Sequence, residues 1–291
     1  MKYWALFVNK LILIHTNIIV VFKEAHRKIK CDGELLDWTT IIQLYFPTLS
    51  LMGMVAKGDE GDMSFGFVVA KHGDIPETWT VEREQIGLYP RKHYDAPTRC
   101  AANAVVLIMN GDECIFAGAH LTLPTNDDSK RAWKKEVDDL KTLLEDKSPR
   151  NFCADMNWLT SNEKSYCDFS FLPNSYGLDE THLTFVACPD DCPPYKILCN
   201  DVGGNPEKIS YPFGPIRQGG SEEDPQLRPC SSLDLSSCQG GEHYIGYPDK
   251  SGEICFTTAQ TMTLEKALEI KNEMTVENPY RMDHLVQLFV F

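Results

Sequence analysis

CIFAGAHLTLPTNDDSKRAWKKEVDDLKTLLEDKSPRNFCADMNW, residues 114–158, carries the strongest fold signal in this sequence. Its first part, Cys114–His120, is a continuous apolar run of the kind found in buried β-strands. Another apolar run, at residues 103–109, precedes it, and Asn110-Gly111-Asp112 lies between the two. Two apolar runs joined by Asn-Gly are typical of a β-hairpin, so we predict that these two strands pair.

The middle of the same stretch predicts an amphipathic helix. Residues 129–147 place apolar side chains at helical spacing, and Asp128 or Ser129 can cap the first turn. The apolar stripe consists of Trp133, Val137, Leu140 and Leu144. Residues 152–154 then form the end of a short buried strand, which opens into a loop at Asp155. The predicted order is therefore strand, helix, strand.

Further strands and one more helix are predicted elsewhere in the chain. Apolar runs at Ile18–Phe22, residues 64–70 and Leu285–Phe291 favour strands, and residues 263–275 favour a helix. Residues 188–252 are rich in Pro, Gly, Ser and Cys, which indicates long loops between short strands. Because strands dominate and helices are inserted between them, we expect an α/β sandwich in which two sheets face each other.

Bulk composition narrows the classes of function. The chain has 291 residues, 43% of them apolar, which is enough for the core of a two-sheet sandwich covered by helices. Its formal net charge is −14, the opposite sign to that of proteins that coat nucleic acid through phosphate contacts. We therefore expect no strong nonspecific DNA binding, although a local basic groove remains compatible with this charge.

The cysteines and the N-terminal residues bear on the compartment. There are 11 cysteines, and the nearest pair, Cys188 and Cys192, has no second metal-ligand pair beside it. We expect free thiols and a location inside the cell, in the cytoplasm or nucleus. Residues 4–22 form the only membrane-like stretch, but polar residues interrupt it and no cleavage signal follows. Two buried elements are therefore favoured over a membrane anchor, and no membrane association is expected.

Four short motifs carry the residue types that phosphate chemistry requires. They are Phe22–His26 (FKEAH), Gly118–Leu121 (GAHL), Cys153–Trp158 (CADMNW) and Met282–Leu285 (MDHL), and each lies at or just past the end of an apolar run. Metal-assisted hydrolysis needs a carboxylate for a hard cation, donors for the phosphate oxygens and a group that positions water. The side chains that supply this inventory are Glu24, His120, Asp155, Asn157, Asp283 and His284.

In this order the motifs resemble the signature of the endonuclease/exonuclease/phosphatase superfamily, which is DNase I-like. The resemblance covers roughly residues 18–291, and the predicted helix lies between the second and third motifs, as it does in that family. It implies a four-layer sandwich of two mixed β-sheets flanked by helices. Residues 1–17 would then be an N-terminal apolar segment. One interpretation of this segment is a truncated first strand of the family fold.

The resemblance also implies a role for each site residue. Glu24 would bind the Mg²⁺ or Mn²⁺ ion, with Asp283 beside it near the metal. His120 would contact the phosphate, and His284 would contact it from the opposite side. Asp155 would activate the attacking water, and Asn157 would contact a phosphate oxygen. Asp249 would orient the last histidine, His284.

Several positions depart from the family pattern. The asparagine of the family's first strand has no clear counterpart, because Asn17 lies only seven residues before Glu24, too close for an intervening crossover. Lys23, Ala154 and Met282 stand where the family has glutamine, glycine and serine. Alanine restricts a backbone angle that glycine allows. A degenerate, catalytically weak or inactive binding member of the fold is therefore one alternative.

Two branches of the family share motifs with this sequence. Asp155–Trp158 followed by Phe171–Asn174 is similar to 5′-tyrosyl-DNA phosphodiesterases. Tyr195-Lys196 is similar to inositol 5-phosphatases, but the Asn-Tyr-Arg that follows their aspartate is absent. We predict a metal-dependent phosphodiesterase or nuclease that acts as a monomer on a phosphate ester, with nucleic acid as one candidate substrate. A phosphoinositide-type phosphatase is the other alternative.

Overall fold

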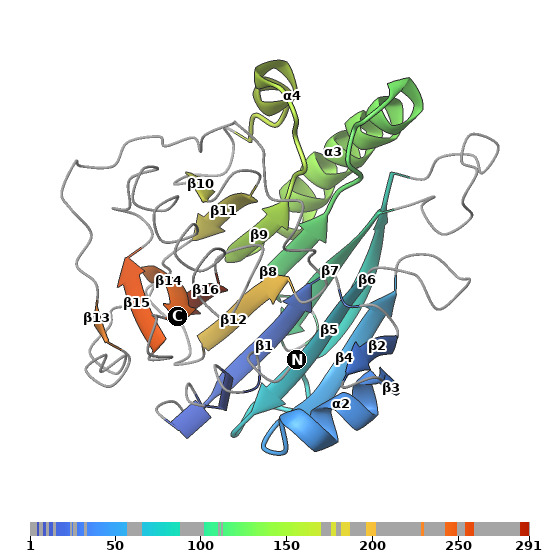
Figure 1. Cartoon of the computed structure of the whole chain (residues 1–291). Coiled ribbons are helices and arrows are strands. Elements are labelled where there is room, and N and C mark those ends of the chain that lie inside the picture. The colour runs from blue at the N-terminus through green and yellow to red at the C-terminus, as the bar shows by residue number, and fades with distance from the viewer. Residues whose placement is uncertain are drawn as a thin grey trace.

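The computed structural model covers the whole chain, shown in Figure 1. It describes residues 5, 8–9, 12–13, 16–23, 25, 28–31, 34–56, 66–87, 102–109, 111, 113–169, 176–178, 182–186, 196–201, 228–229, 242–248, 254–258 and 286–290. These residues form a mixed α/β structure, which confirms the α/β part of the predicted fold class.

The larger sheet has eight strands and is mixed. Its strands are β1 (Ile18–Lys23), β4 (Ser50–Ala56), β5 (Gly66–His72), β12 (Lys196–Asp201), β13 (Arg228–Pro229), β14 (Glu242–Pro248), β15 (Ile254–Thr258) and β16 (Val286–Val290). Their order is β13-β15-β14-β16-β12-β1-β5-β4. Only β1 and β12 pair in parallel, and all other neighbours are antiparallel. Strand β1 therefore lies inside the sheet, with a partner on each side.

The second sheet has six strands in the order β10-β11-β9-β8-β7-β6. The bounds are β6 (Thr80–Ile86), β7 (Ala102–Met109), β8 (Glu113–His120), β9 (Asn151–Asp155), β10 (Tyr176–Leu178) and β11 (His182–Val186). Strands β7 and β8 pair antiparallel, which confirms the predicted hairpin. Strands β8 and β9 pair in parallel, so the chain crosses over between them.

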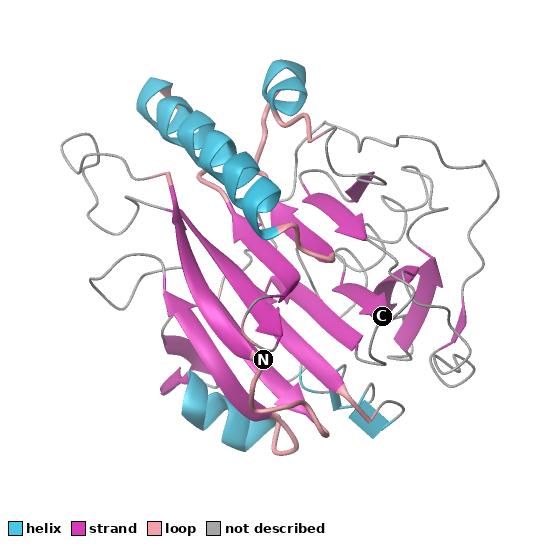
Figure 2. Ribbon diagram, turned by 180° about the vertical axis from the view of Figure 1, so that it is seen from behind, coloured by secondary structure: helices cyan, strands magenta, loops and turns pink. Residues whose placement is uncertain are grey.

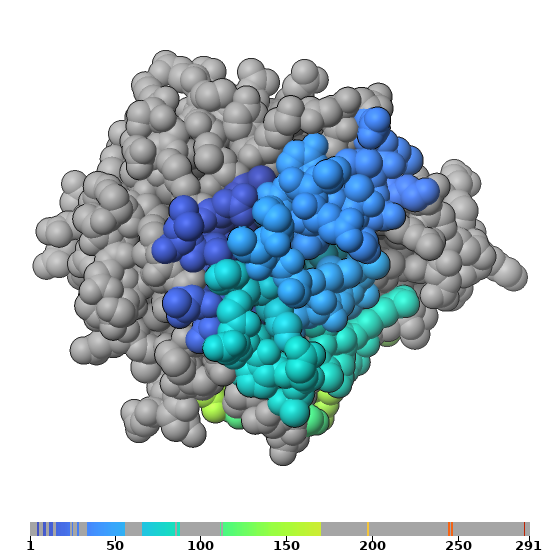
Figure 3. Space-filling view, turned by 90° about the horizontal axis from the view of Figure 1, so that it is seen from below, coloured from blue at the N-terminus to red at the C-terminus, as the bar shows by residue number. Residues whose placement is uncertain are grey.

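Besides the helical residues of the N-terminal segment, the described structure contains three further helices and a small hairpin. They are β2 (Lys28–Cys31), β3 (Glu34–Asp37), α2 (Trp38–Tyr45), α3 (Asp127–Lys147) and α4 (Ser161–Tyr166). In Figure 2, the view from behind, α3 lies over the sheet and runs roughly along its strands, while α2 lies at the lower edge. Figure 3 shows that the described surface seen from below belongs mainly to the N-terminal part of the chain. The predicted helix at residues 263–275 lies outside the described residues.

Alternating side chains divide the apolar core into three clusters. One cluster contains residues of both sheets, including Val21 and Val69 of the larger sheet and Phe116 and Cys153 of the smaller one. The opposite face of β1 packs against α2 in a second cluster. The opposite face of β8 and β9 packs against α3 in the third. Each central strand thus buries both of its faces, which explains its continuous apolar sequence.

Helix α3 begins two residues earlier than the sequence pattern predicted. Asn126, and not Asp128 or Ser129, is the N-cap, and its side chain accepts a hydrogen bond from the Ser129 backbone. The Ser129 hydroxyl accepts in return from the Asn126 N–H at 2.9 Å, which completes a capping box. The predicted apolar stripe is buried throughout, from Trp133 to Leu144.

The N-terminal segment packs against the larger sheet. Its described residues Ala5, Val8 and Ile12 are helical and buried in the cluster that also contains α2. Leu13, also helical, is 86% exposed. The described part of this segment is thus helical and not extended. No helix in the described residues is long and apolar enough to cross a membrane.

This packing predicts a contrast between two neighbouring positions. Val8→Asp should destabilise the protein by about 3–5 kcal/mol, because it buries an unpaired charge in the core. Leu13→Asp should change the free energy of unfolding by less than about 0.5 kcal/mol, because its side chain is exposed. Urea unfolding followed by circular dichroism measures both. Equal stability of the two variants would show that this segment does not pack on the sheet.

Three of the described cysteines have low expected reactivity. Cys114, Cys153 and Cys167 are buried and form no disulfide, in agreement with the expectation from the sequence. Burial raises the pKa of Cys114 to about 12 and raises the pKa of Cys167 as well. Since the thiolate is the nucleophile, iodoacetamide at pH 8 should label Cys114 about a thousandfold more slowly in native than in urea-unfolded protein. Peptide mass spectrometry measures this ratio, and similar rates would contradict it.

Candidate active site

His120 and Asp155 lie side by side at the ends of two parallel strands. His120 is the last residue of β8, Asp155 is the last residue of β9, and the two are register partners. The His120 Nε2 atom is 3.7 Å from the Asp155 Oδ2 atom. The side chain of Asp155 is 4% exposed and that of His120 is 15% exposed. The structure therefore brings together two of the predicted site residues.

The direction of these side chains follows from strand alternation. Ala119 and Ala154, the residues just before them, pack into the cluster beneath α3. Because successive side chains of a strand point to opposite faces, His120 and Asp155 point away from α3, toward the larger sheet. Cys153, two residues before Asp155, accordingly belongs to the cluster shared by both sheets.

Asn157 is joined to both strand ends by hydrogen bonds. Its backbone N–H donates to the Asp155 Oδ1 atom at 3.0 Å, and its Nδ2 atom donates to the Leu121 carbonyl at 2.8 Å. The Leu121 N–H in turn donates to the Asp155 carbonyl at 2.9 Å. One N–H bond of the Asn157 amide remains available to a ligand, since an amide nitrogen carries two. A third predicted site residue thus belongs to the same hydrogen-bonded unit.

The backbone of Asn157 is left-handed, with φ of 52°. Asparagine tolerates this region better than most residues, which explains its suitability for the turn that Asp155 closes. Ala154, by contrast, has ordinary strand geometry within β9 and fills part of the core beneath α3. Its methyl group therefore imposes no backbone strain where the family pattern has glycine.

Helix α3 contacts both of the loops that leave these strands. The Trp133 Nε1 atom donates to the Met156 carbonyl at 2.6 Å, in the loop after β9. Glu136, one turn further along α3, accepts two hydrogen bonds from Thr122 in the loop after β8. These contacts were not predicted from the sequence. The signal that could have pointed to them is Glu136 itself, a charged residue beside the apolar stripe of the helix.

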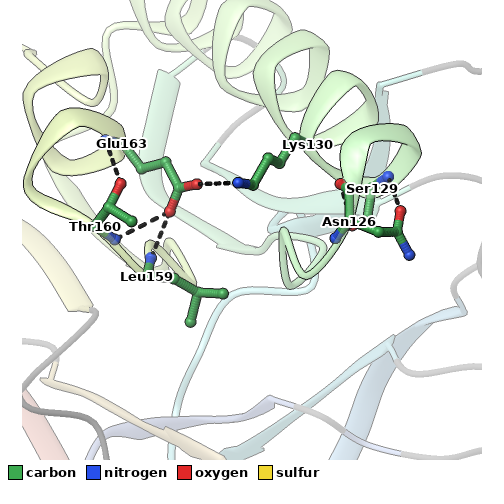
Figure 4. Close-up of polar contacts among 6 residues, drawn as sticks. All are labelled: Asn126, Ser129, Lys130, Leu159, Thr160 and Glu163. Atoms are coloured by element: carbon green, nitrogen blue, oxygen red, sulfur yellow. Dashed lines mark hydrogen bonds and ion pairs between the residues drawn. The ribbon is translucent and has the colours of Figure 1, made fainter.

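The segment after Asn157 is held by Glu163 of α4. Its Oε2 atom accepts from the backbone N–H groups of Leu159 at 2.7 Å and Thr160 at 3.1 Å. Its Oε1 atom is 4.0 Å from the Lys130 Nζ atom of α3, as Figure 4 shows. Because Glu163 is buried, these contacts stabilise the segment at Leu159 and Thr160 that follows Asn157.

The other predicted site residues are not placed relative to this pair. Glu24, Asp249, Asp283 and His284 all lie outside the described residues. Within the described part of the chain, no group of three or more His, Cys, Asp or Glu side chains could hold a metal ion.

Strand β1 ends near the expected position of the first motif. Its last residue, Lys23, is fully buried and is followed by Glu24. In Figure 1, β1 runs in the same direction as β8 and β9, so the carboxyl ends of these strands point the same way. Asn17 lies at the opposite end of β1, where its Oδ1 atom accepts from the Asp74 N–H at 2.9 Å. It therefore serves a turn and not the site.

Comparisons with known proteins give distant structural neighbours only. No protein-family model matches the chain, and no curated protein is significantly similar to it. Humanized D. rerio TDP2 with 14 mutations has a TM-score of 0.38 and 11% identity, covering 88% of this chain and 90% of that one. The human Nocturnin catalytic domain with bound sulfate has a TM-score of 0.34 and 13% identity, covering 60% and 64%.

ANGEL2, a 2′,3′-cyclic phosphatase in complex with adenosine-2′,3′-vanadate, has a TM-score of 0.41 and 12% identity, covering 99% of this chain and 84% of that one. These neighbours are members of the superfamily that the motifs resemble. All of these TM-scores are below 0.5.

The left-handed backbone of Asn157 predicts an inverted order of stability. Asn157→Gly should be more stable than Asn157→Ala by about 1 kcal/mol, because alanine is strained at positive φ. At Thr142, an exposed position in α3, the alanine variant should instead be more stable than the glycine variant by about 1 kcal/mol. Urea unfolding of the four variants measures both differences. The same order at both positions would contradict the assigned backbone.

Proposed function

We propose that the protein is a divalent-metal-dependent phosphoesterase, of the phosphodiesterase or nuclease type. The observation that carries this proposal is the unit formed by His120, Asp155 and Asn157, with the histidine and the aspartate 3.7 Å apart. Imidazole, carboxylate and amide groups at the ends of adjacent parallel strands are the set required to bind a phosphate and position a water molecule.

Each residue of the unit has a distinct task under this proposal. His120 donates a hydrogen bond to a phosphate oxygen on which negative charge increases during the reaction. Asp155, whose Oδ1 atom is held by the Asn157 backbone, keeps the imidazole in place and orients the attacking water. The remaining N–H of the Asn157 amide donates to a second phosphate oxygen. His284 contacts the phosphate from the opposite side, and Asp249 orients it.

The donor chemistry of the chain suits a hard cation. Glu24 and Asp283 would hold Mg²⁺ or Mn²⁺ through carboxylate oxygens, which these ions prefer. The described end of β1 supports this assignment, because Glu24 follows directly on a strand that runs in the same direction as β8 and β9 (Figure 1). When bound, the ion would neutralise charge on the phosphate oxygens.

The remaining expectations extend the same proposal. Residues 18–291 would form a four-layer sandwich, and residues 1–17 would be an N-terminal segment packed on it. The enzyme would act as a monomer inside the cell, without membrane association or strong nonspecific DNA binding. The three free buried cysteines support a reducing compartment.

Lys23 favours a second candidate function, a binding protein with a degenerate site. Its side chain is fully buried one residue before Glu24, and in its protonated form it would add a positive charge near the proposed cation position. Like charges at short range disfavour one another, and metal affinity would fall. Lys23→Gln should then raise Mg²⁺ affinity in calorimetry, with Glu24→Ala as the variant that abolishes binding. Unchanged affinity in Lys23→Gln would exclude this candidate.

Turnover of bis-(p-nitrophenyl) phosphate tests the main proposal. Wild-type protein with Mg²⁺ or Mn²⁺ should hydrolyse this diester and stop when EDTA is added. Asp155→Asn and His120→Ala should each lower kcat about a hundredfold or more. Asp146→Asn, an exposed charge at the end of α3, is the control and should retain full activity.

Two outcomes would overturn the proposal. One is the absence of metal-dependent turnover in folded wild-type protein, and the other is full activity of Asp155→Asn. If turnover is found, a panel of 5′-tyrosyl DNA, abasic DNA, poly(A) and phosphoinositide identifies the substrate class.

A further inference from the structure

We propose that Glu136 of α3 is a positioning residue that sets the pose of His120 and Asn157 from the far side of the smaller sheet. The inference rests on the proposed function, because it concerns the same site. Glu136 acts through Thr122, two residues beyond His120.

Glu136 is a buried carboxylate with a defined acceptor role. It is 1% exposed, and the Thr122 backbone N–H donates to its Oε2 atom at 2.6 Å. The Thr122 hydroxyl donates to its Oε1 atom at 2.7 Å. Hydrogen bonds to a charged acceptor are shorter and stronger than neutral ones. Each carboxylate oxygen thus holds a different atom of Thr122, which fixes both the position and the rotation of this residue.

The constraint on Thr122 is transmitted to the site by the residue before it. The Leu121 N–H donates to the Asp155 carbonyl at 2.9 Å, and the Leu121 carbonyl accepts from the Asn157 Nδ2 atom at 2.8 Å. Leu121 therefore lies between a residue anchored on α3 and two residues of the site. A shift of Thr122 would move Leu121, and with it His120 and the amide of Asn157.

A second contact makes α3 a common support for both strand ends. Trp133, on the same face of α3 and three residues before Glu136, donates to the Met156 carbonyl at 2.6 Å. Met156 lies between Asp155 and Asn157 in the chain. One rigid helix thus fixes the loop after β8 through Glu136 and the loop after β9 through Trp133. Both contacts hold the loops that leave the strand ends where His120 and Asp155 are register partners.

The glycine at position 87 leaves room for the Glu136 side chain. A Cβ atom at Gly87 would lie 2.1 Å from the Glu136 Cγ atom, so a side chain at Gly87 would displace Glu136. Asp139, three residues further along α3, accepts from the Gly87 N–H at 2.8 Å. Asp139 serves as the matched control, because it anchors Gly87 to the same helix while both donors of Thr122 go to Glu136.

Three variants separate positioning from stability. Glu136→Ala removes both acceptors, Glu136→Gln keeps one acceptor and the side-chain volume, and Asp139→Ala removes the anchor of Gly87. With bis-(p-nitrophenyl) phosphate, Glu136→Ala should lower kcat about tenfold to a hundredfold and leave KM within about threefold, because misplaced groups slow the chemical step. Glu136→Gln should recover much of the loss, and Asp139→Ala should keep the wild-type kcat.

A second measurement does not require turnover. The ¹³Cε1–¹Hε1 signal of His120, identified with the variant His120→Gln, should shift in Glu136→Ala and stay in place in Asp139→Ala. Wild-type inactivity together with this shift would reject the proposed function and leave the positioning role intact. An unchanged His120 signal in folded Glu136→Ala would overturn the inference. So would a decrease in kcat of equal size in Asp139→Ala.

Discussion

The parallel pairing of β8 with β9 is the constraint on which the rest of the site depends. Parallel neighbours cannot be joined by a tight turn, so the chain must cross over, and α3 forms that crossover. The same pairing puts the last residues of both strands at one edge of the sheet. His120 and Asp155 come together because they occupy matching positions at the ends of two strands.

The crossover helix combines an apolar face with two polar anchors. Most of its buried residues contribute only apolar surface, but Trp133 and Glu136 also donate or accept hydrogen bonds at the strand ends. Burying a carboxylate is unfavourable unless it is hydrogen-bonded, and Glu136 meets that requirement through Thr122. These hydrogen bonds resist sliding of the helix along the sheet. Apolar packing alone restrains such sliding less, because the hydrophobic effect is non-directional. The site therefore depends on a helix that contributes no catalytic group.

Local sequence patterns predicted the elements around the site but missed other elements and the tertiary contacts. The hairpin at Asn110-Gly111, the helix and the strand that ends at Asp155 follow from periodicity and turn chemistry, which act over a few residues. The β2–β3 hairpin and α2 were missed because they have short, mixed patterns, and β4, β6 and α4 were missed as well. The cap of α3 was misplaced by two or three residues, since several capping residues follow one another there. The Glu136–Thr122 contact depends on tertiary packing, which no local pattern encodes.

The hydrogen bonds around Asn157 show why a local turn and a functional role need not be competing explanations. Asp155 and Asn157 form an Asx turn, the ordinary interpretation of Asp-x-Asn in a loop. The same turn occupies Oδ1 of Asp155 with a backbone N–H and leaves Oδ2 beside His120. It also gives Asn157 the left-handed backbone from which its amide reaches the Leu121 carbonyl. Local chain geometry is thus the means by which three polar groups acquire fixed orientations, and this rigidity is what the proposed phosphate chemistry would require of them.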